Sequence, residues 1–306
     1  MPSQFPTRRE FLGAAGTTLA AAALASAAPS ASTEKKNTEK KFKKSLKFSM
    51  VKHNGTMLEK FKMLSDVGFD GVELDAPNID YDKKEILAAF DKTGLAIPGV
   101  IEATHWKVTF SDPRKEVRTQ AVATLEAALR DAKLYGATTV LLVPAVVNKE
   151  VSYAEAYDRS QAEIRKALPV AEETGVKIAF ENVWNNFLLS PLETARYIDE
   201  FNSPWVGAYF DVGNIVAYGW PEQWIRILGK RILKLDIKEY SRKLANDEGT
   251  RKGFGVELLE GDCDWPAVMT ALREIGYEGW GSAEVRGGGE ERLREISVRM
   301  DRCFAS

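Results

Sequence analysis

The chain has 306 residues, a formal net charge of −2 and 44% hydrophobic residues. This composition supplies enough apolar side chains for a sizeable core. The near-neutral charge, with no basic stripe, argues against a nucleic-acid partner. Two cysteines, Cys263 and Cys303, could pair with each other, but one pair does not make a disulfide scaffold.

The first segment carries the features of an export signal. Arg8 and Arg9 come just before Phe11, and a weakly apolar Ala/Leu/Thr run continues to Ala28. Paired arginines in this position indicate a twin-arginine signal, so we predict that residues 1–28 direct the chain to the periplasm. A short membrane anchor is the alternative, but the run is too short and too rich in Ala and Gly to span a bilayer. Residues 29–45 are rich in Ser, Thr, Lys and Glu and predict a disordered linker.

Residues 46–306 repeat one unit, in which a short β-rich run is followed by a loop and an amphipathic helix. The predicted strands are Leu46–Val51, Gly71–Leu74, Ala96–Ile101, Thr138–Val143, Val176–Phe180, Val206–Phe210, Ile232–Leu235 and Gly281–Ala283. The clearest predicted helices are Met57–Val67, Asp82–Thr93, Arg114–Tyr135 and Tyr153–Thr174. A glycine follows each of these helices, where a left-handed cap is favoured.

Eight alternations of strand and helix indicate parallel strands joined by right-handed crossovers. An open, doubly wound sheet is the rival architecture. Such a sheet usually has a Gly-rich phosphate turn after its first strand, and none follows Val51. We therefore predict an α/β fold, a single (β/α)8 TIM barrel over residues 46–306, whose length is typical of this fold.

An acidic residue follows each of the last four predicted strands. Active sites of such barrels lie at the C-terminal ends of the strands. Glu181, Asp211, Asp236 and Glu284 each stand at such an end. Four converging anions repel one another and lose hydration, and a divalent cation relieves both costs. Ligation by oxygen alone suits Mn²⁺ or Mg²⁺, so we predict that these four residues bind such an ion.

Each acid taken alone has an ordinary alternative role as a helix cap or an ion-pair partner. Asp236 in particular has Lys234, Lys238 and Glu239 nearby, which could supply an ordinary ion pair. Glu73 and Asp75, after the second strand, are expected to be supporting charges. Because a carboxylate recurs at four successive strand ends, one shared metal site is favoured over four unrelated helix caps or ion pairs.

Six segments then occur in an order typical of one superfamily: Lys177–Asn182, Tyr209–Asn214, Asp236–Tyr240, Leu259–Trp265, Ile275–Trp280 and Ala283–Val285. In this series the chain resembles the xylose-isomerase-like sugar phosphate isomerase/epimerase superfamily, which includes tagatose 3-epimerase-like and hydroxypyruvate isomerase-like enzymes. The resemblance covers the predicted barrel and is clearest from Lys177 to Val285. Each motif alone is weak, and the series together is specific for the superfamily but not for a substrate.

The resemblance implies that Glu181, Asp211 and Glu284 bind the metal, and that Glu181 and Glu284 also act as acid and base on the sugar. The sequence departs from the family pattern in two places. Asp236 stands where the family usually has a histidine, which keeps a ligand but makes the site more anionic. Asn214 stands where many members have another histidine, which puts a proton or metal role at that position in doubt.

Other residues are predicted to contact the substrate because they follow predicted strands. They are His53, His105, Lys107, Trp184 and Arg286. Sugars often stack on aromatic rings, and Trp106, Tyr209 and Trp220 are further candidates for such stacking. For each of these residues, ordinary packing or hydrogen bonding is the alternative.

The combined features predict a metal-dependent isomerase or epimerase that acts on a ketose or sugar derivative through an enediolate. Export favours a free sugar, an oxidised sugar or a glycoside over a sugar phosphate. A lyase that eliminates from 3-keto-glycosides would use the same groups, and a non-catalytic sugar-binding barrel is another alternative. Two histidines and a near-neutral charge argue against an endonuclease IV-type enzyme, which needs a histidine-rich zinc site and a basic DNA face. We expect no stable membrane anchor, and homo-oligomerisation stays open.

Overall fold

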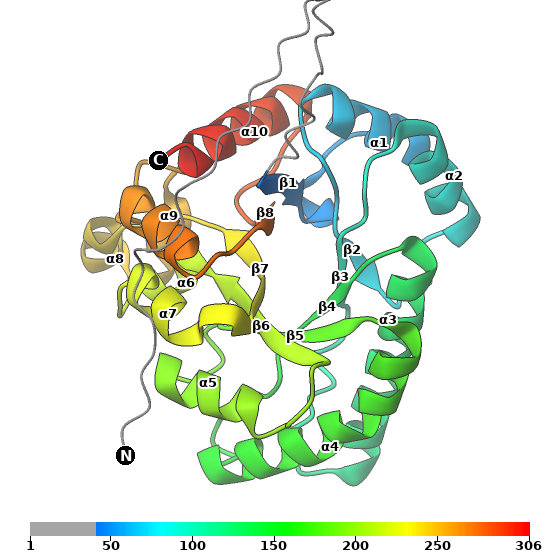
Figure 1. The fold of residues 1–306 in the computed structure, drawn as a ribbon, viewed down its shortest axis with the longest axis vertical. Helices are drawn as coiled ribbons and strands as arrows, with labels where there is room; N and C mark the ends of the chain where they lie inside the picture. Colours follow the sequence, from blue (N-terminus) through cyan, green and yellow to red (C-terminus); the bar gives the residue numbers. More distant parts are fainter. Residues whose placement is uncertain (1–40) are drawn as a thin grey trace, which may run out of the picture. The chain divides into compact units, whose positions relative to one another are not determined.

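Eight parallel strands curl around a common axis, and helices surround them (Figure 1). The computed structural model describes residues 41–306. The strands pair in the order β1-β8-β7-β6-β5-β4-β3-β2. Backbone hydrogen bonds from Glu73 N to Leu46 O and from Phe48 N to Glu73 O, both 2.9 Å, join β1 to the segment before β2. The predicted (β/α)8 barrel is therefore confirmed.

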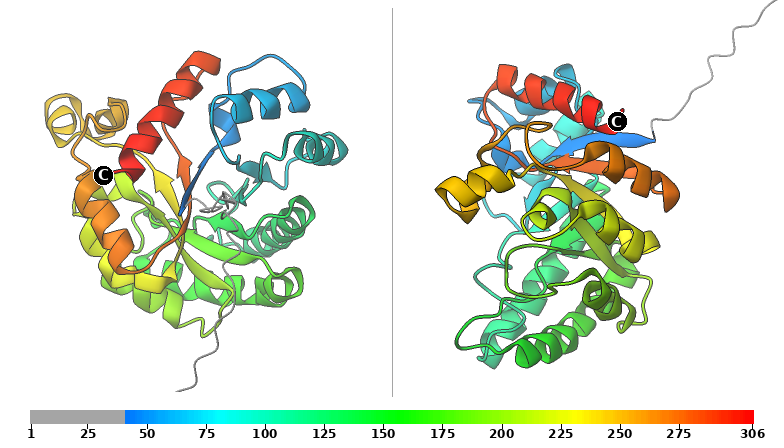
Figure 2. Two further views of the ribbon diagram at one scale, coloured as in Figure 1. Left: turned by 45° about the horizontal axis from the view of Figure 1, so that its top comes forward. Right: turned by 90° about the vertical axis from the view of Figure 1, so that its left-hand side faces the viewer.

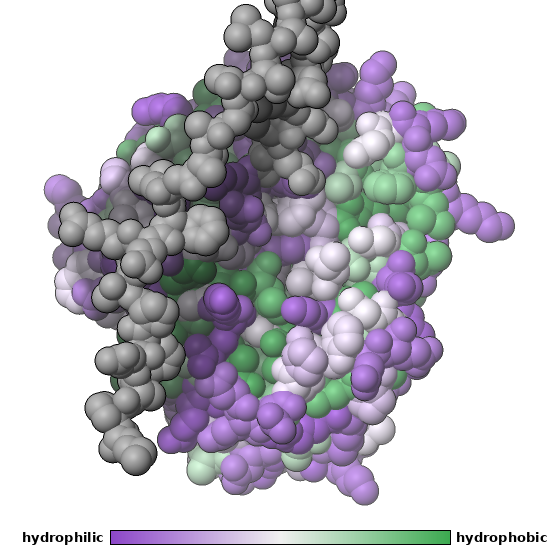
Figure 3. Space-filling view, viewed as in Figure 1, coloured by the Kyte–Doolittle hydropathy of each residue, from purple (hydrophilic) through white to green (hydrophobic). Residues whose placement is uncertain are grey.

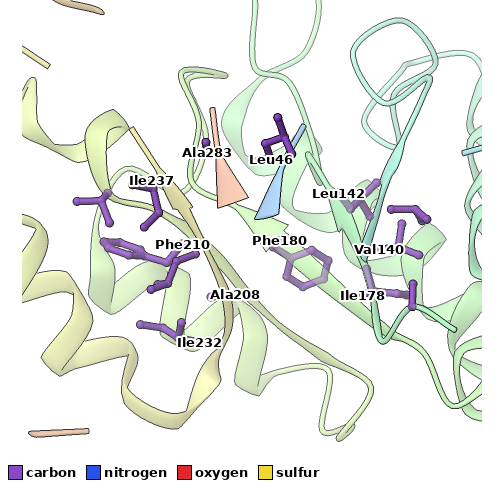
Figure 4. Close-up of a cluster of buried hydrophobic side chains, with 14 of the residues drawn as sticks. Leu46, Val140, Leu142, Ile178, Phe180, Ala208, Phe210, Ile232, Ile237 and Ala283 are labelled. Carbon is purple, nitrogen blue, oxygen red and sulfur yellow. The ribbon is translucent and has the colours of Figure 1, made fainter. Parts of the chain in front are cut away.

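The strands are short and consistently parallel, as expected where helical crossovers connect them. Their bounds are β1 Phe42–Leu46, β2 Leu74–Ala76, β3 Gly99–Glu102, β4 Thr139–Leu142, β5 Lys177–Glu181, β6 Val206–Asp211, β7 Ile232–Ile237 and β8 Gly279–Ala283. Side chains alternate between the two faces of each strand. Ile178, Phe180, Ala208 and Phe210 belong to the main apolar core beneath the helices (Figure 4).

The other face of the strands lines the barrel interior. Leu141, Ala179 and Tyr209 form a separate small apolar cluster there. On β5 and β6 this inner series continues two residues further, to Glu181 and Asp211. The two-residue period therefore directs these carboxylates toward the barrel axis.

The helices lie outside the strands (Figure 2). Their bounds are α1 Met57–Asp66, α2 Lys83–Thr93, α3 Lys115–Tyr135, α4 Tyr153–Thr174, α5 Pro191–Asp199, α6 Val212–Val216, α7 Pro221–Leu228, α8 Arg242–Glu248, α9 Trp265–Glu274 and α10 Glu290–Phe304, with short 3-10 helices η1 Phe48–Met50, η2 Gly229–Arg231 and η3 Thr250–Gly255. Local signals set the ends: Ser152 caps α4 in a capping box with Glu155, and Gly175 ends it in the left-handed conformation. Hydrophilic side chains gather along the outer rim in Figure 3.

The start of the barrel differs from the sequence-based prediction. β1 spans Phe42–Leu46, so all but its last residue lie in the predicted linker of residues 29–45, and the rest of the predicted strand Leu46–Val51 contains η1 instead. β1 is largely polar in sequence, yet its Lys44 is buried. Lys44 can be buried because its Nζ donates to Ser297 Oγ at 2.9 Å and pairs with Asp301. The predicted signal, residues 1–28, lies outside the described residues.

Two further expectations concern the whole described part. Cys263 and Cys303 are both buried and are not joined in a disulfide. No helix between residues 41 and 306 is both long enough and apolar enough to cross a membrane.

Candidate metal centre

The four predicted carboxylates converge at one end of the barrel. Glu181 and Asp211 are the last residues of β5 and β6, Asp236 lies near the end of β7, and Glu284 directly follows β8. Asp211 and Asp236 are register partners on neighbouring strands. One ligand oxygen from each of the four residues lies within 4.8 Å of the others. The structure thus brings together the four predicted side chains, drawn from four different strand ends.

Three of the four carboxylates are also shielded from solvent. Asp211 and Asp236 are fully buried, Glu181 is 7% exposed, and the Glu284 side chain is 38% exposed. Asp236 Oδ2 has no hydrogen-bond partner among the described residues. A buried anionic oxygen without a donor is costly unless a cation compensates it. The all-oxygen donor set and this unpartnered oxygen fit a hard divalent cation.

Burial and mutual repulsion raise the pKa of some of these carboxyls, and nearby lysines lower the pKa of Glu284. Burial, followed by the charges of Glu284 and Asp236, raises the pKa of Glu181. Burial also raises the pKa of Asp211 to about 6, although Lys238 opposes the change. For Glu284, Lys238 and Lys47 together outweigh burial, so its pKa falls. Adjacent carboxyls with diverging pKa values are suited to acid and base roles.

Two cavities adjoin the carboxylates. The first has a volume of about 250 Å³ and is lined by Glu181 and Glu284 together with His105, Trp106 and other polar residues. The second has a volume of about 460 Å³, and its lining includes Trp106, Trp184 and Lys238. A larger cavity, of about 640 Å³, lies elsewhere around Lys177 and Lys230, and none of the four carboxylates lines it. We place the site at the carboxylates because the chemically competent groups are there.

A family model described as "Xylose isomerase-like TIM barrel" matches residues 61–301. The chain belongs to this family. The L-ribulose-5-phosphate 3-epimerase UlaE of Escherichia coli O1:K1 / APEC is 23% identical over 235 residues, covering 72% of this chain and 79% of that protein. The apo structure of the E. coli 3-keto-D-glucoside 4-epimerase YcjR matches with a TM-score of 0.70 and 17% identity, covering 88% of this chain and all of that one. A structure of the IOLI protein with a zinc atom matches with a TM-score of 0.70 and 18% identity, covering 86% and 98% of the two chains.

In this xylose isomerase-like barrel, lysines balance the carboxylate cluster. Lys238 Nζ lies 2.9 Å from Asp211 Oδ2 and 2.9 Å from Glu284 Oε2. Lys47 Nζ, which follows β1, lies 2.8 Å from Asp236 Oδ1 and 2.9 Å from Glu73 Oε2. The ion-pair partner of Asp236 is therefore Lys47, and not one of the neighbours in sequence that we considered.

The sequence analysis missed Lys47 and Lys238 as site residues. Lys47 stands between Leu46 and Phe48 in the predicted strand Leu46–Val51, and closure of β1 against β8 brings it to the barrel axis. Lys238 stands two residues after Asp236, so the strand period placed it on the same inner face. The two-residue alternation of side chains along β7 is therefore the sequence feature that could have predicted Lys238.

Asn214 and Asn182 hold the Glu181–Asp211 corner of the cluster. Asn214 N donates to Asp211 Oδ1 at 2.8 Å, and Asn182 Nδ2 donates to the Asp211 carbonyl at 2.8 Å. Asn214 Nδ2 donates to the Asn182 carbonyl at 3.0 Å and lies 3.5 Å from Glu181 Oε1. Asn214, the second departure from the family pattern, thus orients two carboxylates.

The predicted substrate-binding residues divide into two groups. His105 lines the first cavity, where its Nδ1 accepts a hydrogen bond from Val143 N at 3.2 Å, and Trp184 lines the second cavity. Within residues 41–306, His53, Lys107 and Arg286 line neither cavity, so their contact with substrate stays a prediction.

Two aromatic candidates for sugar stacking have other roles. Tyr209 is fully buried and donates to Glu73 Oε2 at 2.7 Å, so the expectation that it stacks on sugar is wrong. Trp220 is 55% exposed and packs against Arg242, away from both cavities. Glu73 is a supporting charge, as expected, because it is 1% exposed and pairs with Lys47 and Lys234.

Proposed function

We propose that this protein is a divalent-metal-dependent epimerase or isomerase that acts on a ketose or a related sugar. The observation that carries the proposal is the convergence of four carboxylates beside a polar cavity in a xylose isomerase-like barrel. The naming of UlaE and YcjR as sugar epimerases supports the same reaction class. A non-catalytic sugar-binding barrel would not need this buried ring of acids.

Glu181, Asp211, Asp236 and Glu284 would hold the cation, and Mn²⁺ or Mg²⁺ suits their oxygen ligands. The IOLI protein, which shares this fold, binds a zinc atom, and this supports a divalent ion here. A bound cation supplies positive charge beside the substrate oxygens as negative charge develops on them.

The chain's own carboxylates move the proton in this proposal. One of the two glutamates, Glu181 or Glu284, takes the proton from the carbon next to the carbonyl, and the other returns a proton from the opposite side. Return of the proton to the same carbon from the other face gives an epimer, and protonation at the neighbouring position gives an isomer. His105 stays neutral at pH 7, because burial lowers its pKa to about 4, and it adds no positive charge to the cavity.

The test measures proton exchange directly. Metal-loaded protein is incubated in D₂O with free ketoses and with 3-keto-glycosides, and the products are followed by NMR and mass spectrometry. We expect deuterium at one carbon and an isomer of otherwise unchanged composition; two fragments would assign a lyase instead. Glu181→Gln and Glu284→Gln should remain folded and lose exchange by roughly 10²–10⁴-fold.

Glu278→Gln is the matched control, because Glu278 has a 62% exposed side chain and pairs with Lys41 away from the cluster. Full exchange in Glu284→Gln, or protein that binds no divalent cation when purified without chelator, would refute the proposal. We further propose that the protein works in the periplasm, on the basis of the twin-arginine pattern at Arg8 and Arg9. Fractionation of cells that express the full chain tests this location.

A further inference from the structure

The second cavity meets the first at the carboxylate cluster. Trp106, which is 49% exposed, lines both cavities. Elsewhere, residues that line the second cavity contact residues that line the first. Lys238 Nζ of the second cavity lies 2.9 Å from Glu284 Oε2 of the first. Asn214 of the second lies 3.5 Å from Glu181 of the first. A molecule whose reacting carbon lies at the carboxylates therefore has the second cavity directly beside it.

The walls of the second cavity are aromatic. The rings of Trp184 and Phe254 lie 4.8 Å apart between centroids and are tilted by 45°. With Trp106 they line a space whose polar groups are few: Asn214, Lys238 and Arg251. Apolar ring faces with a small number of polar groups are typical of sites that hold an uncharged, amphipathic group such as a sugar ring.

The charges in this cavity do not favour a phosphate group. Phosphate sites in proteins usually gather several donors, with Arg giving bidentate contacts. Lys238 already lies 2.9 Å from two carboxylates, Asp211 and Glu284, and also lies over the Phe254 ring at 5.2 Å. Arg251 is the remaining cation among the residues lining the cavity. A neutral ring therefore suits these walls better than an anion.

The fold holds these walls in place. Phe254 and Arg251 belong to η3, where Tyr240 Oη donates to the Thr250 carbonyl at 2.8 Å. Ser241 N donates to the Gly253 carbonyl at 2.8 Å, and a Cβ on Gly253 would lie 2.5 Å from Tyr240 Cζ. On the opposite wall, Trp184 Nε1 donates to the Asn214 carbonyl at 2.9 Å. Both walls are therefore anchored to segments that follow β5, β6 and β7.

The cavity sizes point to a ligand with two parts. The first cavity, at about 250 Å³, is below the roughly 300 Å³ at which small-molecule sites usually begin. The second, at about 460 Å³, is larger than the cavity that contains the catalytic carboxylates. A single small sugar in the first cavity would leave Trp184 and Phe254 without contact.

We propose that the second cavity is a subsite for a second sugar ring, so that the substrate is a glycosylated sugar whose other ring reacts at the carboxylates. This inference rests on the proposed function for the identity of the reacting ring. The first cavity binds the reacting ring, and Trp106, Trp184 and Phe254 contact the glycosyl group.

The test measures binding, which does not require turnover. Calorimetry compares D-fructose, fructose 6-phosphate and two glucosyl-fructose disaccharides, maltulose and isomaltulose, on the metal-loaded protein. We expect at least one disaccharide to bind roughly ten-fold more tightly than D-fructose. Phe254→Ala and Trp106→Ala should each weaken that disaccharide by about 3–10-fold, the worth of one aromatic contact. Saturation-transfer NMR should show aromatic protons of the protein next to the glucosyl ring.

Trp220→Ala is the control, because Trp220 is an exposed tryptophan outside both cavities, and it should leave all affinities unchanged. Disaccharides that bind no more tightly than D-fructose would overturn the subsite. The subsite would also be overturned if both Phe254→Ala and Trp106→Ala still bound the disaccharide more tightly than D-fructose. Tightest binding of fructose 6-phosphate, abolished by Arg251→Ala, would assign a phosphate site instead. Absence of deuterium exchange would refute the proposed reaction and would leave these binding results standing.

Discussion

Replacing Lys47 with Met should destabilise the protein strongly, because it leaves two buried carboxylates without their main cation. The Lys47 ammonium lies 2.9 Å from Glu73 Oε2 and 2.8 Å from Asp236 Oδ1. Both carboxylate side chains are at most 1% exposed, and the Lys47 side chain is 5% exposed. Breaking a buried ion pair by removing one partner typically costs about 3–5 kcal/mol.

The lowered pKa of Glu73 shows how strongly its partners stabilise this buried carboxylate. Burial raises this pKa, but Lys47 and then Lys234 overcome burial and lower the pKa from 4.5 to about 2. A carboxyl with a depressed folded-state pKa adds stability above pH 4.5, and that stability is lost as the pH falls toward 2. The shift corresponds to about 3 kcal/mol at neutral pH for all partners of Glu73 together. Lys47 is the largest stabilising contributor among them, which is consistent with a strong loss on its removal.

Urea denaturation of metal-free protein at about pH 7.5 measures this loss as a change in the free energy of unfolding. Lys41→Met is the matched control, because Lys41 pairs with Glu278 at the surface and should change stability by less than about 1 kcal/mol. Adding Glu73→Gln to Lys47→Met should recover part of the loss, since one buried anion is then removed. A loss below about 1 kcal/mol in Lys47→Met would show that this reasoning is wrong.

Three further outcomes follow from individual residues. His105 is neutral when folded, with a pKa lowered by burial, and then by Lys47, to about 4, so stability should fall by up to about 3 kcal/mol as the pH drops from about 6.5 through 4. Urea denaturation of His105→Asn should show a flatter profile in that range; an unchanged profile contradicts the assignment. Asp236→Asn should weaken Mn²⁺ binding at least about ten-fold by calorimetric titration, whereas equal affinity would remove Asp236 from the ligand set. Gly253→Ala should lower thermal stability by about 1–3 kcal/mol, because its Cβ meets the Tyr240 ring, and Gly255→Ala, whose Cβ comes no closer than 3.3 Å to Leu244, should cost less. Equal melting temperatures for these two variants would show that the Tyr240 ring can move aside for a Cβ at position 253 without loss of stability.

Part of the site could be predicted because it depends on local pattern and on one rule of topology. Glu181, Asp211, Asp236 and Glu284 follow apolar runs, and the C-terminal ends of parallel barrel strands meet at one end. The helices were predicted well for a similar reason. The predicted range Tyr153–Thr174 matches α4 at both ends, since Ser152 and Gly175 are caps that act within one turn.

The amino-acid sequence by itself determined the order of strands and helices, the barrel and the identity of the converging acids, because periodicity, caps and strand ends are short-range features. Only the tertiary structure decided where β1 begins, that Lys47 is the counter-ion of Asp236, and that Trp106 and Phe254 line one cavity. Those pairings join residues far apart in the chain. Closure of β1 against β8 and the hydrogen bond from Tyr240 to η3 bring these residues together. Neither contact produces a periodic pattern in the sequence.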